Sequence, residues 1–168
     1  MARNAHAPWL MRDTGLPARK RIRLDPVAYA DPGGICSITV AVRNRRPVFG
    51  DVRVAAVAVD VLRQQAAKAG VAIYGYCVMP DHVHMVLSPS PDCDIVCFVG
   101  EFKNLVQRAA WQVGVKGSFW QASFWDHFLR AEEQLERVVE YVLDNPVRQG
   151  LAAERRDYPF SGSLVFTL

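Results

Sequence analysis

The stretch VAIYGYCVMPDHVHMVL, residues 71–87, decides the fold of this chain. Residues 71–79 and 82–87 are rich in β-branched and other apolar side chains, which is typical of strands. Pro80-Asp81 separates the two segments with a pair of residues that favours a tight turn. The stretch therefore predicts an antiparallel hairpin, and we expect this pair of strands to lie at the centre of a sheet.

The segments on either side of the hairpin extend the prediction to a whole domain. Residues 35–42 include β-branched side chains in an alternating pattern, which is typical of a strand. Residues 51–69 carry apolar side chains at helical spacing, and Gly70 is a plausible end of that helix. The expected order is strand 35–42, helix 51–69, strand 71–79, strand 82–87, helix 95–113, strand 123–129 and helix 132–144. This order is typical of an α+β sandwich of the ferredoxin-like (RRM-like) type, so we expect an antiparallel sheet with helices on one face.

Length and composition favour a single domain. A chain of 168 residues, 51% of them hydrophobic, can bury one core but is too short for two ordinary domains. We expect a basic amino-terminal arm in residues 1–34, the main domain in residues 35–163 and a short tail in residues 164–168. No apolar run approaches the roughly 20 residues that span a bilayer, and the start of the chain lacks the apolar stretch of a signal peptide. The expected location is the cytoplasm, where the four scattered cysteines would stay free.

The positive charge of the chain is concentrated at its start. Residues 1–25 hold six basic side chains against two aspartates, a net +4, although the whole chain carries only +3. Arginine supplies 16 of the 20 basic residues and suits bidentate contacts with phosphate. The codon usage of a GC-rich genome explains the ratio of arginine to lysine equally well. It does not explain the clustering.

His82 and His84 are the first candidate site residues. Side chains alternate along a strand, so both imidazoles point to one face while Val83, Met85 and Leu87 point to the other. The two Cα atoms would lie about 6.5–7 Å apart, close enough for both rings to bind one metal ion. The alternative is a pair of histidines that face solvent or are satisfied in the core. With four histidines in the chain, the other ligands must be amide or carboxylate oxygens, water or substrate, which suits Mg²⁺ or Mn²⁺ acting on a phosphate.

Tyr141 is the second candidate, on the last predicted helix. A helical wheel centred on the apolar stripe groups the following residues on one flank: Gln134, Arg137, Tyr141 and Asn145. Asn145 follows Tyr141 by four residues and could reach the same ion as a third ligand. It also precedes Pro146, which disfavours helical geometry there. The alternative is a tyrosine at the border of the core that packs its ring and exposes its hydroxyl.

These motifs resemble a known family. His82-Val83-His84 resembles the HUH motif (His, hydrophobic, His) of single-tyrosine transposases, and Tyr141 with the residues that follow it is similar to the segment that carries their nucleophile. The closest resemblance is to the REP-associated tyrosine transposases of the insertion-sequence-200-like family. Further matching segments are Trp120-Gln121, FWDHFLR at 124–130, NPVR at 145–148, YPFS at 158–161, and, earlier in the chain, residues 19–24, 31–33 and 45–50. The likeness covers roughly residues 19–163.

The resemblance implies a metal-dependent endonuclease and strand transferase for single-stranded DNA flanked by hairpins. Tyr141 would form a covalent 5′-phosphotyrosine link, and His82, His84 and Asn145 would hold Mg²⁺ or Mn²⁺. The residues expected to contact DNA are Arg19, Lys20, Arg21, Arg23, Arg45, Arg46, Arg130 and Arg148. The alternative for the arm is a solvated terminus without structure. Single-stranded and hairpin DNA are the expected partners, and no membrane is involved.

The aromatic run between the two motifs has a mainly structural interpretation. Of Trp111, Trp120 and Trp125 we expect at least two in the core, although bases could stack on an exposed one. Asp126-His127 is expected to be a structural pair that fixes the fourth strand, with acid–base work as the alternative.

Two other classes of function and one question of assembly stay open. A binding module could use the same sheet without catalysis, and a metal-dependent phosphodiester hydrolase could use the same ion without a covalent tyrosine. We expect a monomer because the motif after Tyr141 resembles the REP-associated branch. A homodimer that exchanges the tyrosine helix is the alternative.

Overall fold

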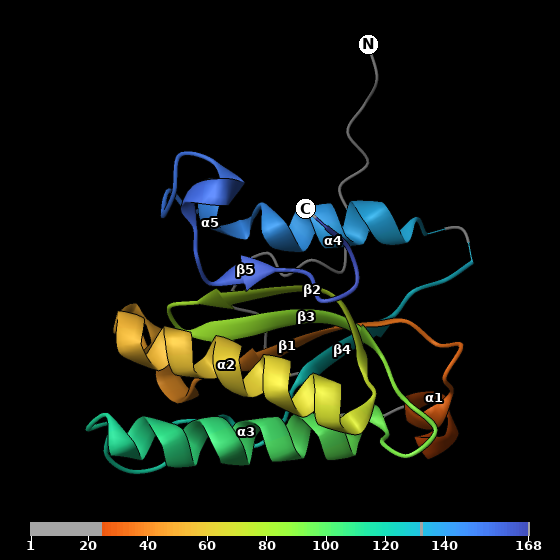
Figure 1. The fold of residues 1–168 in the computed structure, drawn as a ribbon, viewed down its shortest axis with the longest axis horizontal. Coiled ribbons are helices and arrows are strands. Elements are labelled where there is room, and N and C mark those ends of the chain that lie inside the picture. The colour runs from red at the N-terminus through yellow and green to blue at the C-terminus, as the bar shows by residue number, and fades with distance from the viewer. Residues whose placement is uncertain (1–24, 132, 168) are drawn as a thin grey trace.

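The structure is a computed structural model, and it describes residues 25–131 and 133–167. The described residues form one antiparallel sheet of five strands in the order β4-β1-β3-β2-β5 (Figure 1). The strands are β1 (Cys36–Ala41), β2 (Ala72–Met79), β3 (His82–Ser88), β4 (Trp125–Phe128) and β5 (Ser161–Gly162). The helices are α1 (Pro26–Ala30), α2 (Val52–Ala69), α3 (Ile95–Gln112), α4 (Leu135–Leu143) and α5 (Asn145–Arg148), with short 3-10 turns η1 (Arg43–Arg45), η2 (Val48–Gly50) and η3 (Arg155–Asp157). The predicted α+β class is confirmed.

The central hairpin has the predicted form. β2 and β3 pair in antiparallel register, with Met79 opposite His82 and Cys77 opposite His84. β1 pairs with the other side of β3 and places Thr39 opposite His84. Residues that face each other across an antiparallel pair point to the same side of the sheet. The side that carries both histidines, called the histidine face below, therefore also carries Cys77, Met79 and Thr39.

α2 and α3 cover the side of the sheet opposite to the histidine face (Figure 1). The Asp51 side chain caps the first turn of α2, and Gly70 ends that helix in the left-handed conformation, with φ of 67°. Asp94 caps α3 in the same way. The largest buried side chains of this main core include Ile38, Leu62, Ile73, Met85, Leu87, Phe98, Phe102 and Phe119. Among the helices that the structure describes, none has both the length and the apolar character needed to cross a membrane.

α4 lies on the histidine face, which corrects the expectation that the helices share one face of the sheet (Figure 1). Its apolar residues form a second cluster with β2 and β3: Val138, Val139, Val142 and Leu143 pack with Cys77, Met79 and Val86. Gly75 makes room for this helix, because a Cβ atom there would lie 3.0 Å from Val139 Cγ1. The helical period shows that α4 has an apolar stripe. It does not show which side of a sheet the stripe covers, and the apolar residues of β2 on the histidine face decide this.

Part of the predicted arm is packed against the domain. α1 places Tyr29 in the main core at 3% exposure, and the Tyr29 hydroxyl donates a hydrogen bond to Asp126 at 2.8 Å. The packed part of the chain therefore begins before residue 35. A helix of five residues is too short to show a helical period, which is why the sequence does not predict it. Arg19, Lys20, Arg21 and Arg23 lie outside the described residues.

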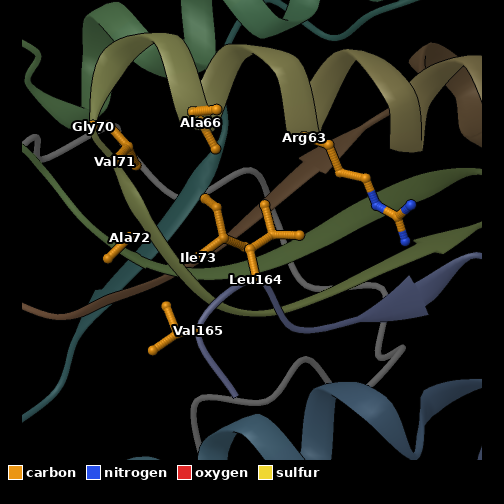
Figure 2. A pocket seen from close by; sticks show the side chains of 9 residues that line it. Arg63, Ala66, Gly70, Val71, Ala72, Ile73, Leu164 and Val165 are labelled. Atoms are coloured by element: carbon orange, nitrogen blue, oxygen red, sulfur yellow. The ribbon is translucent and has the colours of Figure 1, made fainter. Parts of the chain in front are cut away.

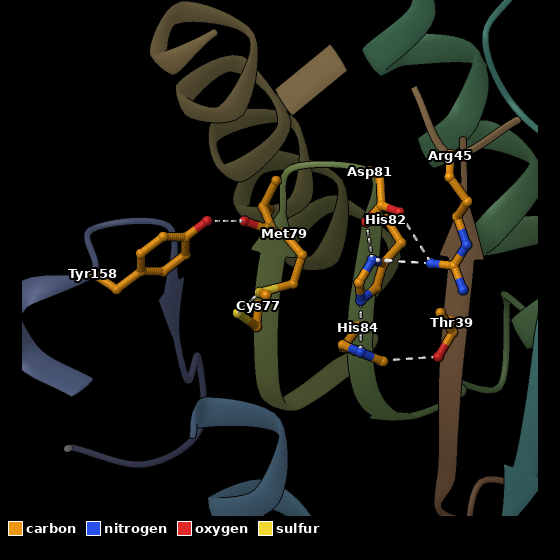
Figure 3. Close-up of polar contacts among 9 residues, drawn as sticks. Thr39, Arg45, Cys77, Met79, Asp81, His82, His84 and Tyr158 are labelled. Atoms are coloured by element: carbon orange, nitrogen blue, oxygen red, sulfur yellow. Dashed lines mark hydrogen bonds and ion pairs between the residues drawn. The ribbon is translucent and has the colours of Figure 1, made fainter. Parts of the chain in front are cut away.

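The carboxy-terminal segment adds an edge strand that the sequence analysis does not predict. β5 pairs with β2 at Tyr76 and Cys77. Gly162 suits this contact, because a Cβ atom there would lie 3.0 Å from the Tyr76 hydroxyl oxygen. The Tyr158 hydroxyl donates to the Val78 carbonyl oxygen at 2.7 Å and ties the same segment to β2 (Figure 3). A strand of two residues has no period, so it could not be recognised from alternation.

Candidate active site

His82 and His84 converge at the start of β3 (Figure 3). Their Nε2 atoms lie 2.9 Å apart, their ring centroids lie 4.5 Å apart, and the ring planes are nearly perpendicular at 88°. His82 is 6% exposed, and His84 is partly buried. The strand alternation puts both rings on one face, and the rotation of the rings then brings the two Nε2 atoms together. Both Nε2 atoms can therefore approach one metal ion that lies beside the pair.

The other ring nitrogen of each histidine has its own partner. His82 Nδ1 lies 2.5 Å from an Asp81 carboxylate oxygen, and His84 Nδ1 lies 2.9 Å from the Thr39 hydroxyl (Figure 3). A carboxylate can only accept, so His82 donates its Nδ1 proton to Asp81, and its Nε2 is the ring nitrogen that faces His84. A hydroxyl can accept as well as donate, so Thr39 can accept the Nδ1 proton of His84, and the lone pair of a neutral His84 is then on Nε2. Partners of this kind orient the ligand histidines of metal sites.

The charges around the pair favour a neutral His84. Burial, followed by the positive charges of His82 and Arg45, lowers the pKa of His84 to about 3. Burial acts to raise the pKa of Asp81, but the hydrogen bond and charge of His82, together with Arg45, hold it below its usual range. The Arg45 guanidinium lies 3.2 Å from Asp81. At neutral pH the site therefore combines an ionised Asp81 with an imidazole of His84 that carries a lone pair.

The geometry of the pair fits a divalent metal ion. Two ligand atoms that each lie about 2.1 Å from one ion at a right angle are about 3 Å apart. The observed Nε2–Nε2 distance of 2.9 Å matches that value. Within residues 25–131 and 133–167, no group of three or more histidine, cysteine, aspartate or glutamate side chains could hold an ion. Further ligands must then be an amide oxygen, water or the substrate, a mixture that suits Mg²⁺ or Mn²⁺.

Asn145 lies where α4 gives way to α5, and it is buried at 7% exposure. Its amide nitrogen donates to the carbonyl oxygens of Tyr141 at 3.0 Å and Val142 at 3.1 Å. Pro146 has no N–H to continue the helix, so the Val142 carbonyl would otherwise lose its helical partner. The distortion expected before Pro146 is present, because α4 ends at Leu143. The amide nitrogen of Asn145 is committed to this junction, and its amide oxygen is the atom suited to bind a metal.

Tyr141 lies on α4, the helix that packs on the histidine face, and its side chain is partly buried. The Arg148 guanidinium stands over the Tyr141 ring, 4.0 Å from its centroid. This cation–π contact places a positive charge beside the phenol. α4 packs on Cys77 and Met79, which are the cross-strand neighbours of His84 and His82. The tyrosine helix and the histidine pair are therefore adjacent on one face.

The predicted DNA-contacting arginines in the described residues have two kinds of surroundings. Arg45 is part of the histidine site through Asp81, and Arg148 stacks on Tyr141. Arg46 and Arg130 are exposed, and the backbone N–H of Arg130 donates to Glu133. The first two arginines thus have local partners at the candidate site, and the other two have side chains open to solvent.

Two site residues were not identified from the sequence. Thr39 lies on another strand, and only the register of β1 against β3 brings it to His84. Asp81 could have been noticed, because it directly precedes His82 in the turn. The expected pairing of Asp126 with His127 is wrong, since Asp126 accepts from Tyr29 while His127 contacts Glu133 at 3.0 Å. Neighbours along a strand point to opposite faces and cannot form such a pair easily.

A groove of about 450 Å³ lies elsewhere, between the end of α2, the start of β2 and the carboxy-terminal segment (Figure 2). Its lining is apolar apart from Arg63, and includes Ile73, Leu164 and Val165. None of the predicted site residues in the described part of the chain lines it. The chemistry of the histidine face therefore does not depend on this groove.

Comparison with known proteins finds relatives of this chain among transposases. A family model described as IS200-like transposase matches residues 35–145. The REP-associated tyrosine transposase of Escherichia coli K12 is 27% identical over 134 residues, covering 79% of this chain and 78% of that protein. The ISDra2 transposase of Deinococcus radiodurans is 35% identical over 69 residues, covering 40% of this chain and 49% of that protein. A solved REP-associated tyrosine transposase, bound to a REP hairpin, is 26% identical, has a TM-score of 0.67, and the match covers 87% of this chain and 82% of that one.

Proposed function

This chain belongs to the IS200-like transposase family, and from that premise we propose that it cuts and rejoins single-stranded DNA through a covalent link to Tyr141. The family and the enzyme class predicted from the motifs are confirmed. One observation supports the catalytic part of the proposal above all. The Nε2 atoms of His82 and His84 lie 2.9 Å apart on the face against which the tyrosine helix packs.

We propose that His82, His84 and the amide oxygen of Asn145 hold Mg²⁺ or Mn²⁺. The Nε2 spacing and the partners of both Nδ1 atoms support this assignment. The amide nitrogen of Asn145 donates to a backbone carbonyl oxygen, so its amide oxygen is the atom suited to bind the ion. The chemistry that such an ion supplies when bound is polarisation of a phosphate oxygen and compensation of its charge. Asp81 and Thr39 orient the two imidazoles for that role.

In the proposed reaction the hydroxyl oxygen of Tyr141 forms a bond to the scissile phosphorus. The bond from phosphorus to the 3′ oxygen breaks, and that oxygen leaves as a 3′-hydroxyl after taking up a proton, while the phenol proton passes to solvent. A free tyrosine has a pKa near 10, so the phenol is a poor nucleophile at neutral pH without help. The Arg148 guanidinium stands over the ring and keeps a positive charge beside the attacking group. Attack by a 3′-hydroxyl reverses the step and joins strands without a further energy source.

We propose that hairpin-flanked DNA is the substrate, because the solved relative is bound to a REP hairpin. Exposed Arg46 and Arg130 are free to reach backbone phosphates, and Arg45 and Arg148 would meet the strand at the site itself. The basic cluster of Arg19, Lys20, Arg21 and Arg23 would add contacts that depend on salt but not on sequence. We propose a cytoplasmic location, because the proposed substrate is DNA.

We propose that the active unit is a monomer. The apolar cluster between α4, β2 and β3 is compatible with a tyrosine helix and a histidine face that belong to the same chain. In light scattering, the free protein is expected to have the mass of one chain, and the complex the mass of one chain plus one DNA molecule. A stable dimer would instead favour exchange of the helix.

The test is the capture of a covalent protein–DNA adduct. The protein is incubated with Mn²⁺ or Mg²⁺ and a labelled hairpin whose single-stranded flanks are randomised, so that the unknown target sequence need not be chosen. Adducts are separated on a denaturing gel. Wild type is expected to form the adduct, and Tyr141→Phe and His84→Ala are expected to lose it. Tyr74→Phe is the matched control, because Tyr74 is also a partly buried tyrosine beside α4.

Each outcome of this test points to a different function. Cleavage that survives Tyr141→Phe would refute the covalent mechanism and favour a metal-dependent hydrolase. Binding of the hairpin without cleavage by wild type would favour a module that has lost catalysis. An adduct that forms equally well in Tyr74→Phe and wild type, but not in Tyr141→Phe, supports the proposal.

A further inference from the structure

Trp125 belongs to a row of side chains that crosses the histidine face. Trp125 of β4 pairs with Thr39 of β1, and Thr39 pairs with His84 of β3. The contact of 2.9 Å between the Thr39 hydroxyl and His84 Nδ1 shows that both side chains point to this face. Paired residues share a face, so Trp125 points there too. It lies two strand spacings from His84, roughly 10 Å.

The neighbours of Trp125 along β4 confirm its direction independently. Asp126 bonds to the hydroxyl of Tyr29, and Phe128 packs against the Tyr29 ring with centroids 5.4 Å apart. Tyr29 is part of the main core, on the side of α2 and α3. Because side chains alternate along a strand, Trp125 must project to the opposite side, which is the histidine face.

α4 leaves the Trp125 ring accessible. The helix packs on β2 and β3, whereas Trp125 lies on β4 at the far edge of the sheet and is 45% exposed. Trp120 is different, since it is 5% exposed and its indole N–H donates to the Lys103 carbonyl oxygen. Trp111 is 50% exposed but lies on α3, on the other side of the sheet. Of the three tryptophans in the described ranges, Trp125 alone combines exposure with a place on the histidine face.

We propose that Trp125 is a stacking site for one unpaired base of the single-stranded DNA whose scissile phosphate lies at His82 and His84. This inference rests on the proposed function, since it names a base-binding residue for the same substrate. An exposed flat ring suits a nucleobase, because every base has a π face on which an aromatic side chain can stack. Trp125, Thr39 and His84 lie in one row across neighbouring strands, and this row ends at the proposed site of the phosphate.

The charges on this part of the molecule also suit a nucleic acid. The nearby carboxylates are already paired: Asp81 contacts Arg45 and His82, and Glu133 contacts His127. Asp126 belongs to the other side of the sheet. Arg130, just beyond the end of β4, has an exposed side chain. A strand that runs from the histidine pair toward β4 would therefore meet no unpaired carboxylate among the residues named here.

The test compares two oligonucleotides with the same backbone. One is a fluorescein-labelled oligothymidylate, and the other is an abasic strand of equal length that has phosphates but no bases. Affinities are measured by fluorescence anisotropy for wild type, Trp125→Ala, Trp125→Phe and a control, Trp111→Ala. The control removes a tryptophan of similar exposure from the other side of the sheet. Loss of one stacked base is expected to weaken oligothymidylate binding about 5- to 100-fold in Trp125→Ala. Trp125→Phe should keep most of the affinity, and Trp111→Ala should equal wild type.

The abasic strand separates stacking from other effects. Wild type is expected to prefer oligothymidylate to the abasic strand, and Trp125→Ala is expected to lose that preference while its affinity for the abasic strand is unchanged. Equal preference in wild type and Trp125→Ala would overturn the inference, even if the covalent adduct with Tyr141 forms normally. Weaker binding of both strands would also overturn it, because that result indicates damage to phosphate contacts or to the fold. Loss of the adduct in Tyr74→Phe or its survival in Tyr141→Phe concerns the proposed function alone.

Discussion

Replacement of Thr39 by valine should weaken metal binding without unfolding the protein. Valine has nearly the shape of threonine and is equally suited to a strand, so the packing of β1 should be kept. The change removes the hydroxyl that lies 2.9 Å from His84 Nδ1. If His84 binds a metal through Nε2, its Nδ1 carries a proton, and in the variant that proton has no acceptor.

The size of the effect follows from the role of Thr39 as an orienting partner. Loss of such a partner typically costs 10- to 100-fold in metal affinity, or about 1.4–2.7 kcal/mol. The loss of one neutral hydrogen bond should change the free energy of unfolding by only about 0.5–1.5 kcal/mol. Metal affinity should therefore fall more than stability does.

The assay is titration with Mn²⁺, in which electron paramagnetic resonance counts the free ion. Thr39→Ser keeps the hydroxyl and should restore much of the affinity. Ser37→Ala is the matched control, because Ser37 lies on the same face of β1 but opposite Val86. Wild-type affinity in Thr39→Val, together with lost binding in His84→Ala, would refute the orienting role. Failure of wild type to bind Mn²⁺ would refute the metal site itself.

Two further predictions concern the helices that support the site. Gly75→Ala should lower the free energy of unfolding by about 1–3 kcal/mol in urea denaturation, because its Cβ would lie 3.0 Å from Val139 of α4. Gly100→Ala on α3 is the control, since its Cβ meets nothing within 4 Å, and an equal loss in both variants would contradict the reasoning. Hydrogen bonds from Arg53 hold the pKa of Asp51 below its usual range, so the carboxylate adds stability that is present above the unfolded-state pKa and is lost as pH falls below about 4. Asp51→Asn keeps the cap of α2 and should show a smaller drop of Tm in acid, and an unchanged drop would exclude Asp51 as a source of it.

The elements that the sequence predicts well are those with a long, regular pattern. The hairpin of β2 and β3 and the helices α2 and α3 were located to within a few residues, because each buries a stripe that repeats several times. α1 and β5 are too short to show any period. Their places depend on single contacts, such as that of Tyr29 with Asp126, which no local sequence pattern predicts.

The same distinction between local patterns and long-range contacts applies to the candidate site. Alternation along β3 is a local property, so the sequence by itself determined that His82 and His84 share a face, and helical spacing put Asn145 on the flank of Tyr141. Only the tertiary structure decided that Thr39 holds His84, that α4 packs on the histidine face, and that Trp125 ends the same row. The physical reason is that strand register and helix docking depend on contacts between residues far apart in the chain. A one-residue change of register would have turned Thr39 and Trp125 to the opposite face without any change in their local sequence.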